Sequence, residues 1–187
     1  DYRFSEPTVA NYSLIKVRFL LSCGRRVGKE EEALLEAIRY CILTASDKGA
    51  RGERADKSGD IIVQWMEDAE ALLVERLLLG DERRELAAQL SEWADEYIVD
   101  IIFTTGGTGF TARDITPEAT ADVIERPVPG IAEALRAEGL KKTPHAMLSR
   151  GISGIRKRTL IINLPGSPKA VTEGMEVLKP VLKHAVE

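Results

Sequence analysis

The chain has 187 residues, of which 26 are Lys or Arg and 30 are Asp or Glu, so its formal net charge is −4. With 44% hydrophobic residues it can bury the core of about one domain, which excludes a disordered chain and a miniprotein held by disulfides. An acidic chain is unsuited to general nucleic-acid binding, because a basic surface is what neutralises phosphates. No apolar run approaches the ~20 residues of a membrane-spanning helix. We therefore expect neither a nucleic-acid partner nor a membrane.

The cysteines point to a reducing compartment rather than to a metal site. Cys41 lies in an apolar run, where a small buried side chain is expected. Cys23 has no cysteine or histidine at the spacing of metal ligands. The chain opens without a basic segment or a cleavage signature, so no secretory signal is visible. These features predict a cytoplasmic protein.

Two parts of the chain differ in pattern. Residues 1–37 form an N-terminal extension of unknown role, in which 29–37 favours a helix. Over residues 38–187, strand-length apolar runs alternate with segments of helical spacing, which favours one α/β domain with a largely parallel sheet. Strands are predicted at 38–44, 71–79, 98–104 and 158–164. Helices are predicted at 58–68, 82–97, 117–124, 130–138 and 167–186, with Ser58, Thr116 and Ser167 as N-caps.

A glycine-rich turn directly follows the predicted strand 98–104. Its sequence is Thr105-Gly106-Gly107-Thr108-Gly109. Ligands of parallel sheets bind outside the carboxyl ends of the strands, and glycines let backbone N–H groups approach a phosphate closely. The turn matches neither a Walker loop nor the dinucleotide fingerprint. A plain glycine-rich connection is the alternative interpretation.

Two aspartates are candidate metal ligands. Asp114 lies between the glycine turn and the next helix, and Asp81 follows the strand at 71–79. A bare carboxylate repels phosphate, but it fits a phosphate site when it holds a Mg²⁺ ion that bridges to the phosphate oxygens. Local helix or turn capping is the alternative role for each.

A second turn follows the predicted strand 158–164. Asn163 is followed by Pro165, Gly166, Ser167, Pro168 and Lys169, and the helix that begins there offers N–H groups to an anion. A common strand–helix connector is the alternative. Ser149 and Arg150 open the most basic stretch of the chain, which predicts either a local anion-binding patch or a solvated charged segment.

At this point the motifs resemble a known family. Thr104–Thr120, together with Ser149-Arg150 and Asn163–Lys169, closely resembles the molybdenum-cofactor biosynthesis family that includes MogA, MoaB and the gephyrin G domain. Ser46-Asp47 matches the same pattern. The resemblance implies a molybdopterin-binding-like fold, a three-layer α/β/α sandwich with a mostly parallel sheet. It also implies a homotrimer and a molybdenum-insertion protein as a partner.

In the Mog branch the resemblance implies a molybdopterin adenylyltransferase, a nucleotidyltransferase. Such an enzyme transfers AMP from ATP to the terminal phosphate of molybdopterin with Mg²⁺. The family's two functional aspartates fall on Asp81 and Asp114. The alternatives are a MoaB-like molybdopterin-binding protein with little catalysis and a gephyrin-like binding or scaffold module. The substrate-binding residues expected from the motifs and the resemblance are Ser46, Asp47, Thr105, Gly106, Gly107, Thr108, Gly109, Ser149, Arg150, Asn163, Pro165, Gly166, Ser167, Pro168 and Lys169.

Overall fold

A six-stranded sheet forms the centre of the molecule, in the order β2-β1-β3-β6-β5-β4. The computed structural model describes residues 37–96 and 99–186, so the helix predicted at 29–37 lies outside the described residues but for its last position. The strands are β1 (Arg39–Ala45), β2 (Leu72–Leu79), β3 (Ile101–Thr105), β4 (Arg126–Pro127), β5 (Ser153–Arg156) and β6 (Thr159–Leu164). The helices are α3 (Asp47–Ala50), α4 (Lys57–Glu67), α5 (Arg83–Glu96), α6 (Thr116–Ala121), α7 (Pro129–Leu140), the 3₁₀ helix η1 (Pro144–Leu148) and α8 (Pro168–Val186).

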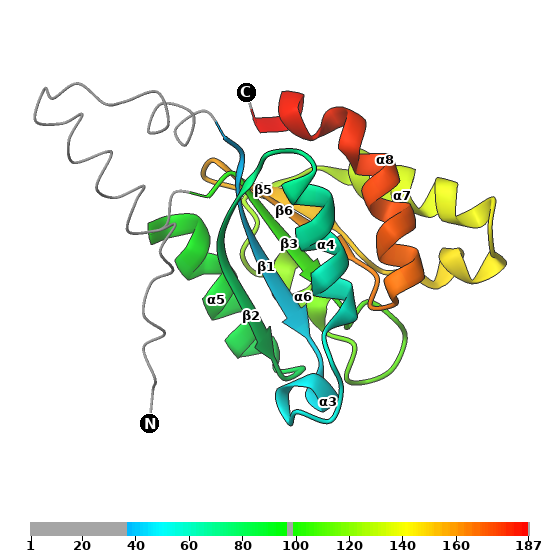
Figure 1. Cartoon of the computed structure of the whole chain (residues 1–187). Helices are drawn as coiled ribbons and strands as arrows, with labels where there is room; N and C mark the ends of the chain where they lie inside the picture. Colours follow the sequence, from blue (N-terminus) through cyan, green and yellow to red (C-terminus); the bar gives the residue numbers. More distant parts are fainter. Residues whose placement is uncertain (1–36, 97–98, 187) are drawn as a thin grey trace, which may run out of the picture.

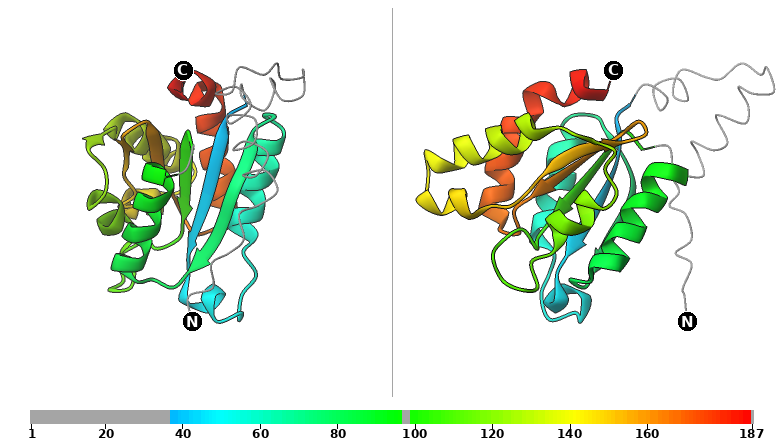
Figure 2. Two further views of the ribbon diagram at one scale, coloured as in Figure 1. Left: turned by 90° about the vertical axis from the view of Figure 1, so that its left-hand side faces the viewer. Right: turned by 180° about the vertical axis from the view of Figure 1, so that it is seen from behind.

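Helices cover both faces of this sheet (Figure 1). On one face α5 and α6 enclose a core around the fully buried Trp93. On the other face α4, α7 and α8 enclose a core around Phe103 and Tyr40, whose rings meet edge to face. The two further views show the same layers from the side and from behind (Figure 2). The predicted three-layer α/β/α sandwich is therefore confirmed.

Four strands run parallel, as the alternation of elements predicts. β1 pairs in parallel with β2 and β3, and β3 pairs in parallel with β6. The sequence analysis missed the antiparallel edge made by β5 and β4. These strands have four and two residues, too few for any periodicity to show.

The start of β3 differs from the prediction. The strand begins at Ile101 rather than at 98, because the side chain of Asp100 binds Arg39. Its carboxylate accepts hydrogen bonds from the backbone N–H and the guanidinium of Arg39. The apolar pattern of the sequence does not reveal that Asp100 forms this ion pair.

Two of the three predicted N-caps are wrong. Asp56, not Ser58, caps α4 by accepting a hydrogen bond from the N–H of Gly59 at 2.9 Å. Helix α6 already includes Thr116, and no described side chain caps it. Ser167 does cap α8, since its Oγ accepts from the N–H of Ala170 at 3.2 Å.

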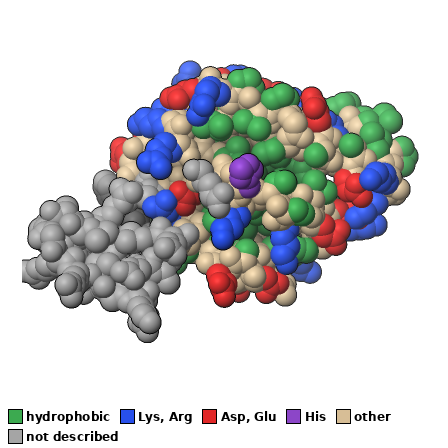
Figure 3. All heavy atoms as spheres, turned by 90° about the horizontal axis from the view of Figure 1, so that it is seen from above, with side chains coloured by type: hydrophobic (Ala, Val, Ile, Leu, Met, Phe, Trp, Pro, Cys, Tyr) green, Lys and Arg blue, Asp and Glu red, His purple; other side chains and the backbone are tan. Residues whose placement is uncertain are grey.

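The face above the amino ends of the strands does not gather charge of one sign. Seen from above, hydrophobic side chains are interspersed with basic and acidic ones over the described residues (Figure 3). Among the described helices, none is long and apolar enough to cross a bilayer. The two cavities described below lie at the opposite edge, where β1, β2, β3 and β6 end.

Candidate functional site

The carboxyl ends of the parallel strands open into a cavity of about 610 Å³. Because parallel strands end at the same edge, the segments that follow β1, β2, β3 and β6 converge there. The sequence-predicted residues that line this cavity are Ser46, Asp81, Thr105, Gly106, Gly107, Asp114, Gly166, Ser167 and Pro168. Residues from four distant parts of the chain thus meet at one place.

Backbone conformation explains the glycines of the turn after β3. Gly106 and Gly107 have φ angles of +93° and +61°, which L side chains rarely adopt. A Cβ on Gly106 would collide with the carbonyl oxygen of Ala45. A Cβ on Gly107 would collide with the hydroxyl of Thr116 and lie 3.1 Å from Oδ1 of Asp81. The turn therefore brings its backbone directly against a candidate metal ligand.

Asp47 and Asp81 hold each other in place. The N–H of Asp47 donates to Oδ2 of Asp81 at 3.0 Å, and the N–H of Asp81 donates to Oδ1 of Asp47 at 3.0 Å. Arg113 adds a bidentate ion pair to Asp47. This pair of reciprocal bonds ties the end of β2 to the start of α3, and it fixes the orientation of the Asp81 carboxylate.

The two carboxylates differ in their pKa. Hydrogen bonds from Arg113 and from the Asp81 backbone lower the pKa of Asp47 to about 2. The pKa of Asp81 is raised, mainly because burial disfavours its charged form and also because Asp47 and Asp114 repel that charge. A cation that enters the cavity would therefore favour the charged form of Asp81.

The remaining oxygens of the aspartates suit a hard cation. Oδ2 of Asp114 accepts from the N–H and the hydroxyl of Thr111, so the local cap expected as an alternative is present. Oδ1 of Asp81 and Oδ1 of Asp114 accept no hydrogen bond from any residue that the structure describes. Mg²⁺ binds through one or two carboxylates together with substrate phosphates and water. The two carboxylates therefore suit Mg²⁺. The described residues contain no cluster of three His, Cys, Asp or Glu side chains that could hold a metal ion on its own.

A second cavity, of about 330 Å³, lies between α7, η1, α8 and the same turns. The sequence-predicted residues that line it are Thr108, Gly109, Ser149, Asn163, Pro165 and Ser167. Ser167 at the start of α8 lines both cavities. Residues of the predicted site thus line two neighbouring cavities.

Three residues that were predicted to bind the substrates do not line either cavity. The Arg150 guanidinium binds the Glu118 carboxylate and the carbonyl oxygens of Gly109 and Asp114, so it braces the glycine turn. Lys169 and Asp47 line neither cavity.

The side chain of Asn163 is also engaged internally. Its amide donates to the hydroxyls of Thr104 and Thr120, each at 2.8 Å, and its Oδ1 accepts from the N–H of Ile152 at 3.2 Å. Because its donors and its acceptor are used, this side chain joins β3, α6 and the start of β5.

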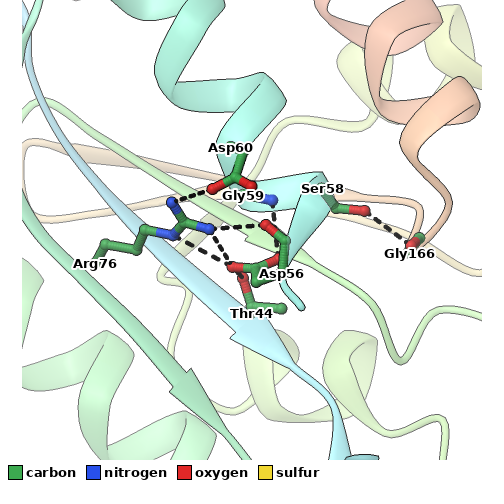
Figure 4. A network of polar contacts seen from close by, with 7 residues as sticks. All are labelled: Thr44, Asp56, Ser58, Gly59, Asp60, Arg76 and Gly166. Atoms are coloured by element: carbon green, nitrogen blue, oxygen red, sulfur yellow. Dashed lines mark hydrogen bonds and ion pairs between the residues drawn. The ribbon is translucent and has the colours of Figure 1, made fainter. Parts of the chain in front are cut away.

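The sequence analysis missed the wall of the larger cavity formed by residues 54–58. There Asp56 accepts from the hydroxyl of Thr44 at 2.7 Å and from the guanidinium of Arg76 at 2.8 Å (Figure 4). Ser58 donates to the carbonyl oxygen of Gly166 at 2.9 Å, which ties this wall to the turn after β6. The alternation of charge in this stretch contains no motif that we recognised. The only signal was its position shortly after the end of a predicted strand.

Comparison with known proteins supplies the family. Residues 41–184 match the family described as "Probable molybdopterin binding domain". That match covers well over half of the chain. The chain belongs to this molybdopterin-binding domain family.

Similar members of the family include curated and solved proteins. The molybdopterin adenylyltransferase of Helicobacter pylori strain J99 is 39% identical over 155 residues, which cover 82% of this chain and 88% of that protein. The MoaB structure from Thermus thermophilus superposes with a TM-score of 0.76 at 48% identity, covering 80% of this chain and 94% of that one. The Mog structure from Mycobacterium ulcerans gives a TM-score of 0.76 at 40% identity, with 80% and 97% covered. The resemblance stated from the motifs is therefore confirmed.

Proposed function

We propose that this protein is a molybdopterin adenylyltransferase. The observation that carries the proposal is the pair of cavities that share Ser167, with Asp81 and Asp114 in the wall of the larger one. A reaction that joins two substrates needs both of them held side by side, with their charges neutralised where they meet. The names of the similar curated proteins support the same activity.

The proposed reaction is a phosphoryl-group substitution. An oxygen of the terminal phosphate of molybdopterin attacks the α-phosphorus of ATP and forms a P–O bond. The bond from that phosphorus to the β-phosphate oxygen breaks, and pyrophosphate leaves with the electron pair. The attacking phosphate is already ionised at neutral pH, so the reaction needs alignment and charge neutralisation rather than a strong general base.

Asp81 and Asp114 are the residues that would hold Mg²⁺. When bound, Mg²⁺ neutralises the charge of the phosphates and orients them. The reciprocal hydrogen bonds with Asp47 keep the Asp81 carboxylate in one orientation. Arg113 holds Asp47 in turn, so it acts as a positioning residue.

We place the pterin of molybdopterin in the smaller cavity. Thr108, Gly109 and Asn163, which the resemblance assigns to pterin and phosphate binding, line that cavity. Its terminal phosphate would then lie at the glycine turn and at the N-terminus of α8, where backbone dipoles favour an anion. ATP would occupy the larger cavity, with its α-phosphate towards Ser167.

A homotrimer is the assembly we propose. Large hydrophobic side chains are exposed in the described part of the chain at Phe110, Leu140, Met147 and Leu148. Exposed apolar side chains of this size favour burial against another copy of the chain. A cytoplasmic location and a molybdenum-insertion partner remain predictions from the sequence and the resemblance.

A MoaB-like protein with little catalysis is the second candidate. The observation that favours it is the 48% identity with a solved MoaB, against 40% with a solved Mog protein. A gephyrin-like scaffold is a weaker alternative, because no described surface of the molecule points to such a partner.

Incubation with molybdopterin, ATP and Mg²⁺ tests the proposal, with adenylylated molybdopterin and pyrophosphate as the measured products. We expect product from the wild-type protein and a loss of at least 100-fold for Asp114→Ala, of about the size seen when one transition-state stabilising group is removed. Binding of molybdopterin without product would favour the MoaB-like candidate. Formation of product by Asp114→Ala at the wild-type rate would exclude the metal role of that residue.

A further inference from the structure

Two basic side chains line the larger cavity without a partner among the described residues. Arg54 and Lys57 are exposed, and neither forms an ion pair or a side-chain hydrogen bond with any residue that the structure describes. The arginines around them differ in this respect. Arg76, Arg113 and Arg150 are all bound to carboxylates. Positive charge is thus available to a ligand at residues 54–57 and is already neutralised at the neighbouring arginines.

The backbone that carries these two residues is held in place. Asp56 lies between them in the sequence, and its carboxylate binds the Thr44 hydroxyl, the Arg76 guanidinium and the Gly59 N–H (Figure 4). Arg76 also binds the backbone carbonyl oxygen of Asp56 at 2.8 Å. These bonds anchor the segment between Arg54 and Lys57, and both of these residues line the larger cavity.

The charge of the cavity indicates what these cations bind. The carboxylates of Asp81 and Asp114 suit one Mg²⁺ ion, but a triphosphate carries more negative charge than one Mg²⁺ neutralises. Further cations are then needed at the phosphates that lie beyond the metal site. Arg54 and Lys57 belong to the part of the larger cavity that the smaller cavity does not share. Neither residue lines the proposed pterin chamber.

We propose that Arg54 and Lys57 bind the β- and γ-phosphates of ATP and hold the pyrophosphate as it leaves. This inference rests on the proposed function for the identity of the nucleotide. In the reaction, the electron pair of the broken P–O bond passes to the pyrophosphate oxygen, and the two cations stabilise the charge that develops there. They touch the leaving group, so both are catalytic residues.

Binding of Mg²⁺-pyrophosphate to the full chain tests this inference without any turnover. Isothermal titration calorimetry would compare wild type with Arg54→Gln, Lys57→Gln and the double variant. We expect each single substitution to raise Kd roughly tenfold, as expected for a lost charge-assisted hydrogen bond. AMP lacks the β- and γ-phosphates, so its Kd should not change. Arg54→Lys keeps the charge, so it should retain more affinity than Arg54→Gln.

Arg51→Gln is the matched control. Arg51 is an exposed arginine three residues away, it pairs with Glu53, and it does not line the cavity. Thermal unfolding of every variant would show whether each one folds. Equal pyrophosphate affinity in wild type and the folded double variant would overturn the inference, as would a wild type that does not bind pyrophosphate.

Steady-state kinetics separates the two proposals. A rise in the KM for ATP in the variants, with an unchanged KM for molybdopterin, supports the assignment. The opposite pattern would place the cations on the molybdopterin phosphate and overturn it. If wild type binds pyrophosphate through these residues but forms no adenylylated product, the phosphate subsite stands and the proposed function fails.

Discussion

Substitution of Asn163 by Ala tests whether this residue mainly stabilises the fold rather than binding the substrate. Its side chain is 3% exposed and makes three hydrogen bonds, to Thr104, Thr120 and Ile152. A buried hydrogen bond contributes about 1 kcal/mol, and both threonine hydroxyls would stay buried without this partner. We therefore expect a loss of about 3 kcal/mol in the free energy of unfolding.

Urea unfolding at a fixed protomer concentration measures this loss. With a slope of about 2 kcal/mol per molar urea, the midpoint should fall by about 1.5 M. Lys169→Ala is the control, because Lys169 is an exposed residue at the start of α8, six positions along the chain, and should change stability by less than about 0.5 kcal/mol.

A double-mutant cycle tests the reasoning at one bond. Asn163→Ala and Thr120→Val both remove the 2.8 Å hydrogen bond between these side chains, so their combined effect should be smaller than the sum. Strict additivity would refute the reasoning. So would a midpoint shift for Asn163→Ala no larger than that of Lys169→Ala.

Three further predictions concern charge and assembly. Asp81→Asn should abolish adenylylation yet raise Tm in EDTA at pH 7. The pKa of Asp81 is raised in the folded state, so the stability that this group contributes is present below its unfolded pKa and is lost as pH rises through its folded pKa. At pH 7 the charged carboxylate therefore lowers the stability of the fold, and the neutral amide removes that cost. An unchanged or lower Tm would contradict this reasoning. Arg113→Gln should raise the pKa of Asp47 from about 2 towards its ordinary value, measured by ¹³C NMR of the carboxyl carbon, and a pKa that stays near 2 would show that the backbone bond from Asp81 suffices. Met147→Lys should shift light-scattering mass from trimer to monomer, and a persisting trimer would place the interface elsewhere.

Much of the parallel part of the fold could be predicted from the sequence. The strands at 38–44, 71–79 and 158–164 each lie within one or two residues of the observed β1, β2 and β6. Their apolar runs are diagnostic because strands buried on both faces need hydrophobic side chains throughout. The short edge strands β4 and β5 escaped prediction, since their pairing depends on neighbours and not on their own pattern.

The helix caps also include one that the sequence predicted and others that it did not. A Ser at the start of a helical pattern predicted the cap at Ser167 correctly, but the same rule failed at Ser58. There, Asp56 two residues earlier takes the capping position because Thr44 and Arg76 hold its carboxylate. Tertiary contacts can therefore select another capping residue than the one that local preference favours.

Some features of the candidate site could likewise be predicted from the sequence, and others could not. By itself the sequence determined that glycine turns and aspartates follow parallel strands, and that such strand ends meet at one edge. Only the tertiary structure decided that these residues line two cavities and that Arg150 and Asn163 are engaged internally. It also decided that Arg54 and Lys57 line the larger cavity without an ion-pair partner among the described residues. The physical reason is that each of these outcomes depends on contacts between side chains far apart in the chain. The register of the sheet and the packing of the helices set those contacts, and no local spacing encodes them.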